Sequence, residues 1–456
     1  MKRSAILLSL AMLMSTVSCG GKAVSSASDT GKAQGIPDLA GGTRTESTTE
    51  ASGEKITIKL AVAESPDWWR GWQLVWDKLN KFNSESDKYY VDVVIYSIDE
   101  DDKFGDTSAQ RLSMDILADD VPDIIAAAPF QLDKFRKNGY LTDLSQYIHR
   151  EDFLGNVISS VEQDGKIQMI YPTFEIYTAA ARTALVGADK ENWTVQDAVG
   201  AYNSFSGDLI SNMYTKYDLR HYFFKGVMAS CIDYKSHTCD LENGLAPVLS
   251  FLSSIPDTGN RNTSGEAAGD VTSGTALVQE MWINGINTYY PTEMLRCFGN
   301  EPVTFVGYPT SSGKGSYADV ADAFGIMANS PHQSEAWDVL AQTIFSDEFQ
   351  MDLNTYSYGV PVSKNAVEEL MSGFGAPFKS TKPEAPVNEE QRVLTEEQKQ
   401  QFYDLLSSIV IDPFINVSIE YMIKEESDYV FDGGRSIDEC IDILQNRIGL
   451  YLSETE

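Results

Sequence analysis

Strand-like and helix-like patterns alternate between residues 56 and 138, and this order most narrowly constrains the fold. Ile56–Val62 alternates as a strand does, and Tyr90–Ile95 forms a second strand-like run. A third run, Asp123–Ala127, is almost wholly apolar, which is typical of a parallel strand buried on both faces. A helical pattern follows each of the three runs. The β-α-β-α-β-α order predicts a doubly wound α/β unit.

The rest of the chain reads as more helical after Gly165. Thr194 with Asp197 predicts a capping box for a helix over Val195–Phe205. Cys231–Glu242 predicts a short hairpin, and Ile437–Leu452 predicts a terminal helix with one apolar side. A chain of 456 residues is long enough for two or three domains. No internal repeat and no phosphate-binding glycine motif is present.

The N-terminus predicts export and a lipid anchor. A charged start is followed by a short apolar run, Ala5–Met14, and then by small residues up to Cys19. That run is shorter than the ~20 residues of a membrane-spanning helix. We predict a lipoprotein signal peptide over residues 1–18 and lipidation at Cys19, with a plain cleaved signal as the alternative. Residues 19–53 are rich in Ser, Thr, Gly and Ala, which predicts a flexible tether. The expected location is extracytoplasmic, anchored to the cell membrane.

Charge and histidine content exclude several kinds of partner. The chain has 35 Lys and Arg against 67 Asp and Glu, a net charge of −32. Such a chain is not expected to bind nucleic acid or an anionic membrane surface. Its four scattered histidines predict no metal site, and we expect no cofactor. The acidic run Asp99–Asp102 lacks the glycine and final glutamate of an EF-hand loop, which favours a solvated loop over a calcium site.

Two cysteines flank the turn of the predicted hairpin. Cys231 and Cys239 could form a disulfide there, because an extracytoplasmic location permits disulfides. Buried free thiols are the alternative, and the sequence leaves both open. The absence of a CxxC motif gives no support for redox catalysis.

Several short motifs follow one another in order along the chain. They are Val121–Ile125, Gly139–Leu144, Asp164–Lys166 with Tyr171 and Pro172, Asn192–Thr194, Asp319–Ile326, Ser334–Trp337, Gly359–Val362 and Asn446–Leu452. Together they resemble the extracellular solute-binding proteins of ABC importers. The most similar branch is family 1, the carbohydrate-binding, maltose-binding-protein-like group. The resemblance covers roughly residues 54–456 and carries no information about which ligand is bound.

The resemblance implies an α/β fold of the periplasmic-binding-protein type, with two lobes, a hinge and an interlobe ligand cleft. Lobe one is expected over residues 54–166 and 325–363, and lobe two over residues 167–324 and 364–456. The implied function is capture of a carbohydrate, in particular an oligosaccharide, by a monomer that delivers it to a membrane permease without catalysis. A lipid-anchored glycan hydrolase and a ligand sensor of the same fold are the alternatives.

One group of candidate ligand residues directly follows the first predicted strand. Sugars are held by flat aromatic surfaces and by carboxylates or amides that accept from hydroxyl groups. Glu64, Asp67 and Trp68 offer both kinds of contact. They lie beyond the carboxyl end of a strand, where ligands bind in open α/β sheets. The alternative is an acidic turn that opens a helix.

The second group comes from the middle of the chain. The resemblance places a ligand carboxylate just after the crossing at residues 171–172, which indicates Glu175 with Tyr177. Trp282 follows a small-residue segment similar to the one that precedes a stacking aromatic in the family, with a core tryptophan as the alternative. Tyr317 and Tyr358 are further candidates. No catalytic residue is predicted.

Overall fold

A computed structural model gives the structure of the chain. It describes residues 44–46, 55–63, 72–97, 106–118, 120–213, 215–234, 236–255, 270–286, 289–299, 301–313, 315–373, 394–415 and 417–454. All of them lie in one compact unit, residues 41–456. The signal peptide, Cys19, the run Asp99–Asp102, and Glu64, Asp67 and Trp68 fall outside the described residues. Within the described part of the chain, no helix has the length and apolar character needed to cross a bilayer.

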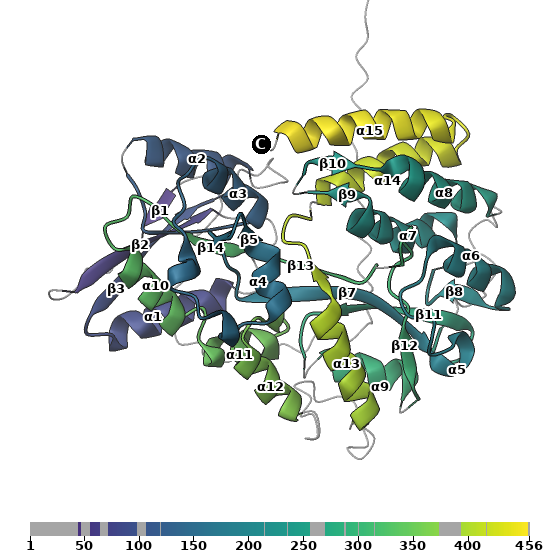
Figure 1. Ribbon diagram of the computed structural model, residues 1–456, viewed down its shortest axis with the longest axis horizontal. Coiled ribbons are helices and arrows are strands. Elements are labelled where there is room, and N and C mark those ends of the chain that lie inside the picture. Colours follow the sequence, from purple (N-terminus) through teal and green to yellow (C-terminus); the bar gives the residue numbers. More distant parts are fainter. Residues whose placement is uncertain are drawn as a thin grey trace, which may run out of the picture. The chain divides into compact units, whose positions relative to one another are not determined.

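The first sheet contains the three strands predicted near the N-terminus. Its order is β1-β3-β2-β4-β14 (Figure 1). Its strands are β1 (Arg44–Glu46), β2 (Ile56–Ala63), β3 (Tyr89–Tyr96), β4 (Ile124–Ala127) and β14 (Ala323–Ile326). Strands β2, β3 and β4 are parallel, and all four residues of β4 are buried, as its apolar sequence predicts. The α/β prediction is therefore confirmed.

Helices cover the first sheet as a doubly wound fold requires. They are α1 (Trp72–Glu85), α2 (Asp106–Leu117), α3 (Pro129–Lys137) and α10 (Gln333–Gln342). Helix α3 packs on β4 and β14. It begins with proline at its first position, where no amide hydrogen is needed. It ends at Asn138, whose side-chain amide donates to the carbonyl of Lys134 at 2.8 Å.

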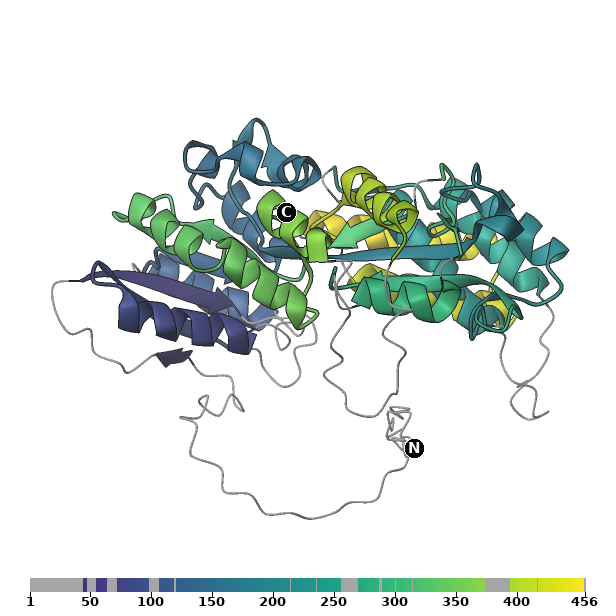
Figure 2. The same cartoon turned by 90° about the horizontal axis from the view of Figure 1, so that it is seen from below.

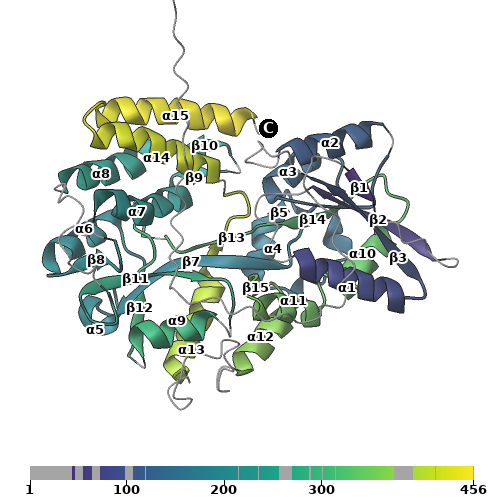
Figure 3. The same ribbon diagram turned by 180° about the vertical axis from the view of Figure 1, so that it is seen from behind.

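The second sheet has the order β16-β13-β7-β11-β8, and β12 and β15 also pair with β7 (Figure 3). Its strands are β7 (Thr173–Arg182), β8 (Asp208–Ile210), β11 (Ala276–Ile283), β12 (Val303–Phe305), β13 (Tyr317–Asp319), β15 (Val360–Pro361) and β16 (Val410–Ile411). The sequence-based prediction of a mainly helical region after Gly165 is therefore incomplete. Strand β7 is the central strand of this sheet. Its sequence does not look like a strand, because it contains alanines, which favour helices.

Helices surround the second sheet (Figures 1 and 2). They are α5 (Thr183–Val186), α6 (Val195–Ser204), α7 (Lys216–Ser230), α8 (Leu241–Ser254), α9 (Tyr289–Phe298), α13 (Glu396–Ser408), α14 (Val417–Phe431) and α15 (Ile437–Glu454). Beside the start of β7 lie α11 (Asp347–Thr355) and α12 (Lys364–Ser372), and α4 (Gly155–Val161) packs on β16. The capping box of Thr194 and Asp197 is present, which confirms that prediction.

A short hairpin carries the two cysteines. Its strands are β9 (Ile232–Asp233) and β10 (Thr238–Cys239). Both thiols are free in this structure. Cys239 pairs with Ile232 in the hairpin, whereas Cys231 is the C-terminal cap of α7 and has a helical backbone conformation. Cys231 lies against Gly244, whereas the sulfur of Cys239 is 3.1 Å from the side-chain nitrogen of Gln445.

Gly226 in helix α7 is expected not to tolerate alanine. A Cβ atom at this position would lie 2.0 Å from the carbonyl oxygen of Pro309. Alanine gains about 1 kcal/mol over glycine in a helix, but overpacking against backbone costs about 1–3 kcal/mol. We expect Gly226→Ala to lower the unfolding free energy, measured by urea denaturation. The control is Gly200→Ala in α6, where no atom lies within 4 Å and stability is expected to rise. Equal stability of the two variants would contradict the packing argument.

Candidate functional site

Three aromatic side chains form a row across the second sheet. Trp282 on β11 and Tyr317 on β13 both pair directly with Tyr177 on β7, so all three lie on one face. The ring centroids of Tyr177 and Trp282 are 6.2 Å apart with planes 11° apart. Those of Tyr177 and Tyr317 are 5.2 Å apart with planes 15° apart. Tyr177 is thus stacked between two rings, and we call these three residues the aromatic row.

Carboxylates run alongside the aromatic row. Glu175 lies two residues before Tyr177, on the same face of β7, and pairs in register with Asp319. Its Oε2 atom accepts from Trp282 Nε1 at 2.9 Å and from the Tyr177 hydroxyl at 3.3 Å. Glu175 therefore fixes the orientation of two of the three rings. Just after β11, the side-chain oxygen of Asn284 is buried and has no hydrogen-bond partner in the described part of the chain.

A partly buried ion pair lies against the row. Lys225 Nζ on α7 is 2.7 Å from Glu280 Oε1 and 4.9 Å from the ring centroid of Tyr177. The two charged side chains are only 13% and 16% exposed. The Tyr308 hydroxyl also donates to Glu280, at 2.7 Å. Burial, followed by the charge of Glu280, raises the pKa of Tyr308, so this hydroxyl remains a donor.

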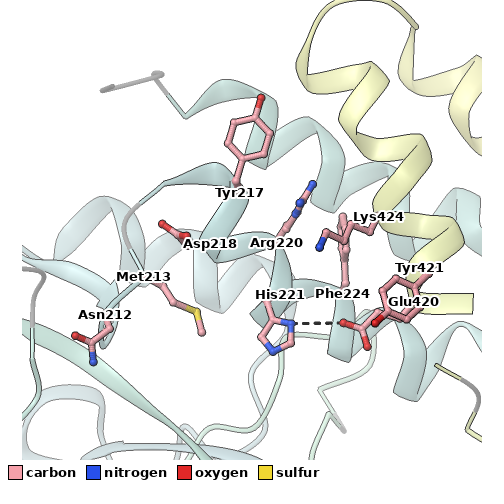
Figure 4. Close-up of a pocket in the computed structure, with 10 residues that line it drawn as sticks. All are labelled: Asn212, Met213, Tyr217, Asp218, Arg220, His221, Phe224, Glu420, Tyr421 and Lys424. Atoms are coloured by element: carbon pink, nitrogen blue, oxygen red, sulfur yellow. Dashed lines mark ion pairs between the residues drawn. The ribbon is translucent and has the colours of Figure 1, made fainter. Parts of the chain in front are cut away.

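Beside the row, a cavity of about 570 Å³ opens between α7, α14 and the turn that follows β8 (Figure 4). It is lined by Asn212, Met213, Tyr217, Asp218, Arg220, His221, Phe224, Glu420, Tyr421 and Lys424. Most of these side chains are polar or aromatic, and most come from α7 and α14. We call this the α7–α14 pocket.

The fold explains why the pocket lies near the aromatic row. Strands β8 and β11 are parallel, so the turn after β8 and the end of β11 lie at the same edge of the sheet. Asn212 occupies that turn with a φ of 62°, a left-handed conformation that asparagine adopts more readily than most residues. On α7, His221, which lines the pocket, and Lys225, which contacts the ring of Tyr177, are one helical turn apart.

Charge in the pocket is mixed and nearly balanced. His221 Nδ1 is 3.4 Å from Glu420 Oε1, and Arg220 pairs with Asp428. Burial acts to raise the pKa of Glu420, but His221, Lys225 and Lys424 outweigh it and hold the pKa below its ordinary value. The pocket therefore offers both ionised acceptors and cationic donors.

This lowered pKa predicts a difference in acid stability. A carboxylate whose folded pKa is lowered stabilises the protein fully above its ordinary pKa, 4.5, and loses that contribution as the pH falls through the folded pKa. Thermal unfolding of Glu420→Gln is therefore expected to depend less on pH than that of the wild type below about pH 4.5. Glu397→Gln, at an exposed position on α13, is the control and should follow the wild type. Parallel curves for the wild type and Glu420→Gln would contradict the assignment.

The structure brings together four of the residues predicted from the sequence. Glu175, Tyr177, Trp282 and Tyr317 are neighbours in the second sheet. Tyr358 lies apart from them in the chain, on the segment before β15. Its carbonyl accepts from the Thr173 hydroxyl at 2.8 Å, and its ring stacks on Tyr356, with 6.5 Å between the centroids.

The residues of the α7–α14 pocket are absent from the sequence prediction. They belong to no motif, and the two helices that carry them are far apart in the chain. The one signal available was Thr215 with Asp218, which form the capping box that starts α7. Among the residues that the structure describes, no group of three or more His, Cys, Asp or Glu side chains is placed to hold a metal ion.

Comparison with known proteins adds independent evidence. A family model described as "Bacterial extracellular solute-binding protein" matches residues 79–386. No curated protein matches the chain.

Three solved structures share the fold. An extracellular solute-binding protein family 1 from Alicyclobacillus acidocaldarius is 12% identical, with a TM-score of 0.57, covering 88% of this chain and 99% of that one. The sugar-binding protein MalE from Xanthomonas citri is 13% identical, with a TM-score of 0.55 and coverage of 88% and 98%. A putative oligosaccharide periplasmic-binding protein from Synechococcus sp. MITs9220 is 13% identical, with a TM-score of 0.51 and coverage of 87% and 99%. At these identities the likeness shows the fold alone.

Proposed function

Because the chain belongs to the bacterial extracellular solute-binding protein family, we propose that it captures an oligosaccharide and hands it unchanged to the permease of an ABC importer. The family consists of binding proteins, so the alternative of a glycan hydrolase is set aside. The observation that carries the proposal is the aromatic row, with its aligned carboxylates, beside the α7–α14 pocket.

The chemistry of this region suits a neutral sugar chain. Aromatic rings cover the C–H faces of sugars, and Glu420, Asn212 and the cations of α7 and α14 can accept from or donate to hydroxyl groups. The nearly balanced charge gives no advantage to an anionic ligand, because the ionised Glu420 would repel it. A volume of about 570 Å³ lies within the range of small-molecule sites, about 300–1,000 Å³. The names of the Xanthomonas protein, a sugar-binding protein, and of the Synechococcus protein, a putative oligosaccharide-binding protein, agree with this ligand class.

We place the ligand between two lobes that close on it. In this proposal, lobe one comprises residues 54–166 and 325–363, and lobe two comprises residues 167–324 and 364–456. Glu64, Asp67 and Trp68 directly follow β2 and contribute contacts from lobe one. The segment before β15 serves as part of the hinge. There Gly359 has a φ of 114° and donates its N–H to the carbonyl of Asn284 at 2.9 Å.

The N-terminus completes the proposal. We propose that Cys19 is lipidated after removal of residues 1–18, and that residues 20–53 tether the binding domain to the outer side of the cell membrane. A tether of about 34 residues spans roughly 30–35 Å on average, which lets the domain reach a permease in the same membrane. The binding protein acts as a monomer, with the solute and the permease as its partners.

Tyr421 provides a test of the pocket. Its side chain is 61% exposed and lines the α7–α14 pocket, so a sugar can reach its ring. We expect Tyr421→Ala to weaken binding of the tightest-binding oligosaccharide about 5- to 10-fold, because an aromatic contact contributes about 0.5–1.5 kcal/mol. The measurement is isothermal titration of the full chain with neutral oligosaccharides such as maltotriose. The control is Tyr403→Ala, at a 45%-exposed tyrosine on α13 outside the pocket. Equal affinities of the two variants would place the ligand elsewhere.

A further inference from the structure

His237 lies between helix α3, which packs on the first sheet, and helix α15, which packs with the helices around the second sheet. It lies in the turn between β9 and β10, and its Nδ1 atom is 2.5 Å from the carbonyl oxygen of Leu452 on α15. Its Nε2 atom is 3.0 Å from Nζ of Lys137 on α3. Helix α3 packs on the first sheet, whereas α15 packs on β10 and on the helices around the second sheet (Figures 1 and 3). His237 is therefore a direct link between the two halves of the protein.

The partners of His237 assign its protonation state. A carbonyl oxygen only accepts, so Nδ1 carries the hydrogen that is donated to Leu452. An ammonium group only donates, so Nε2 carries a lone pair toward Lys137. The link with both bonds formed thus requires neutral histidine in the Nδ1–H form.

The contact between α3, the hairpin and α15 around His237 is small. His237 lies in the turn with a φ of 57°, a left-handed conformation that histidine adopts more readily than most residues other than glycine. A cavity of only about 30 Å³ remains between α3, the hairpin and α15. Among the described residues that line it, the other titratable side chains are Asp133 on α3, Tyr234 on the hairpin and Tyr451 on α15.

Among the described residues that line this cavity, Asp133 is the acidic one, and it already forms ion pairs with two cations on its own helix. Asp233, on β9 of the hairpin, pairs in register with Thr238 next to His237. Asp133 is 2.6 Å from Arg136 and 3.2 Å from Lys137. It therefore offsets only part of any additional positive charge on His237. Protonation of Nε2 would replace an acceptor by a cation facing the Lys137 ammonium, and the hydrogen bond across the contact would be lost.

We propose that His237 is a pH-sensitive latch that holds the two halves together when neutral and releases α3 when protonated. The proposal rests on the proposed function in one respect, that the two sheets belong to lobes that open and close. With the latch formed, the closed arrangement is favoured before any solute binds. Protonation removes that advantage, so the apparent affinity for the solute falls on acidification.

Small-angle X-ray scattering of the solute-free full chain tests the latch. We expect the radius of gyration of the wild type to increase from about pH 8 to about pH 5. Loss of negative charge from a chain with a net charge of −32 acts in the opposite direction, because it reduces self-repulsion. An expansion on acidification therefore points to a specific contact.

Three variants make the test specific. His237→Ala should show the larger radius at both pH values. Lys137→Gln should remain compact at both, because its amide can accept from a protonated His237 and donate to a neutral one. The matched control, Lys134→Gln on the same helix, should keep the full response of the wild type.

The proposal is overturned if the wild type does not expand, if His237→Ala keeps the response, or if Lys134→Gln loses it as Lys137→Gln does. These results are independent of any solute. If the scattering results contradict the latch, the sugar-binding proposal still stands. If the protein binds no sugar, the scattering results still test the latch.

Discussion

Replacing Trp282 by alanine is expected to weaken oligosaccharide binding about 100-fold and to lower the unfolding free energy by about 3 kcal/mol. The indole stacks on Tyr177 and donates to Glu175 at 2.9 Å. Its loss uncovers one face of Tyr177 and leaves a partly buried carboxylate oxygen with one donor fewer. Both effects disturb the aromatic row, so affinity should fall by more than the loss of a single contact explains. Titration calorimetry and urea denaturation measure the two quantities.

The control for this variant is Trp337→Ala on α10. Trp337 is also stacked, on Tyr147 with 6.4 Å between centroids and on Phe345 with 5.9 Å, but it packs with the first sheet. The Trp337→Ala substitution should lower the unfolding free energy by a similar amount and leave the affinity of the folded protein for the oligosaccharide unchanged. If the two variants lose affinity equally, the aromatic row is not the binding surface.

Replacing Lys225 by methionine is expected to lower the unfolding free energy by about 1.5–3 kcal/mol. The ammonium group lies 2.7 Å from Glu280 and over the ring of Tyr177, and its loss leaves the partly buried Glu280 carboxylate without its counter-charge. The double variant Lys225→Met, Glu280→Gln should recover much of the loss, because the neutral amide still accepts from Tyr308. Urea denaturation of the single and double variants gives the interaction free energy between Lys225 and Glu280.

The exposed pair on α13 serves as the control for this cycle. Lys399 pairs with Glu396 at 2.7 Å, but the Glu396 side chain is 90% exposed. Solvent screens such a pair, so Lys399→Met should change stability little. Additive effects of the Lys225 and Glu280 substitutions, or an equal loss at Lys399, would contradict this account of the partly buried pair.

The sequence predicted the first sheet better than the second for a physical reason. Strand β4 is continuously apolar because it is buried on both faces, and such a run is distinctive. In β7, residues 179–181 are alanines, which have a high intrinsic helix propensity, but their pairing with β11 and β12 overrides this propensity. Pairing between distant segments is invisible to a local pattern. The same limit applies to Cys231 and Cys239, since spacing in the sequence does not give the position of each thiol.

The candidate site divides in the same way. Glu175, Tyr177 and Trp282 were found through motifs in the sequence that resemble the family, and the cross-strand register places them side by side. The pocket pair of His221 and Glu420 was not found, because only the packing of α7 on α14 brings these residues together. The contacts of His237 with Lys137 and Leu452 were likewise not predictable, because these residues are far from His237 in the sequence.

The central claim is that this protein binds an oligosaccharide and leaves it unchanged. The most direct measurement is thermal unfolding of the full chain with a panel of mono- and oligosaccharides, followed by chromatography of the recovered sugars. A solute at 100 times its Kd should stabilise the folded state by about 2.7 kcal/mol, and the sugar should be recovered intact. Cleavage of the sugar, or stabilisation by amino acids or peptides with none by any sugar, would contradict the account.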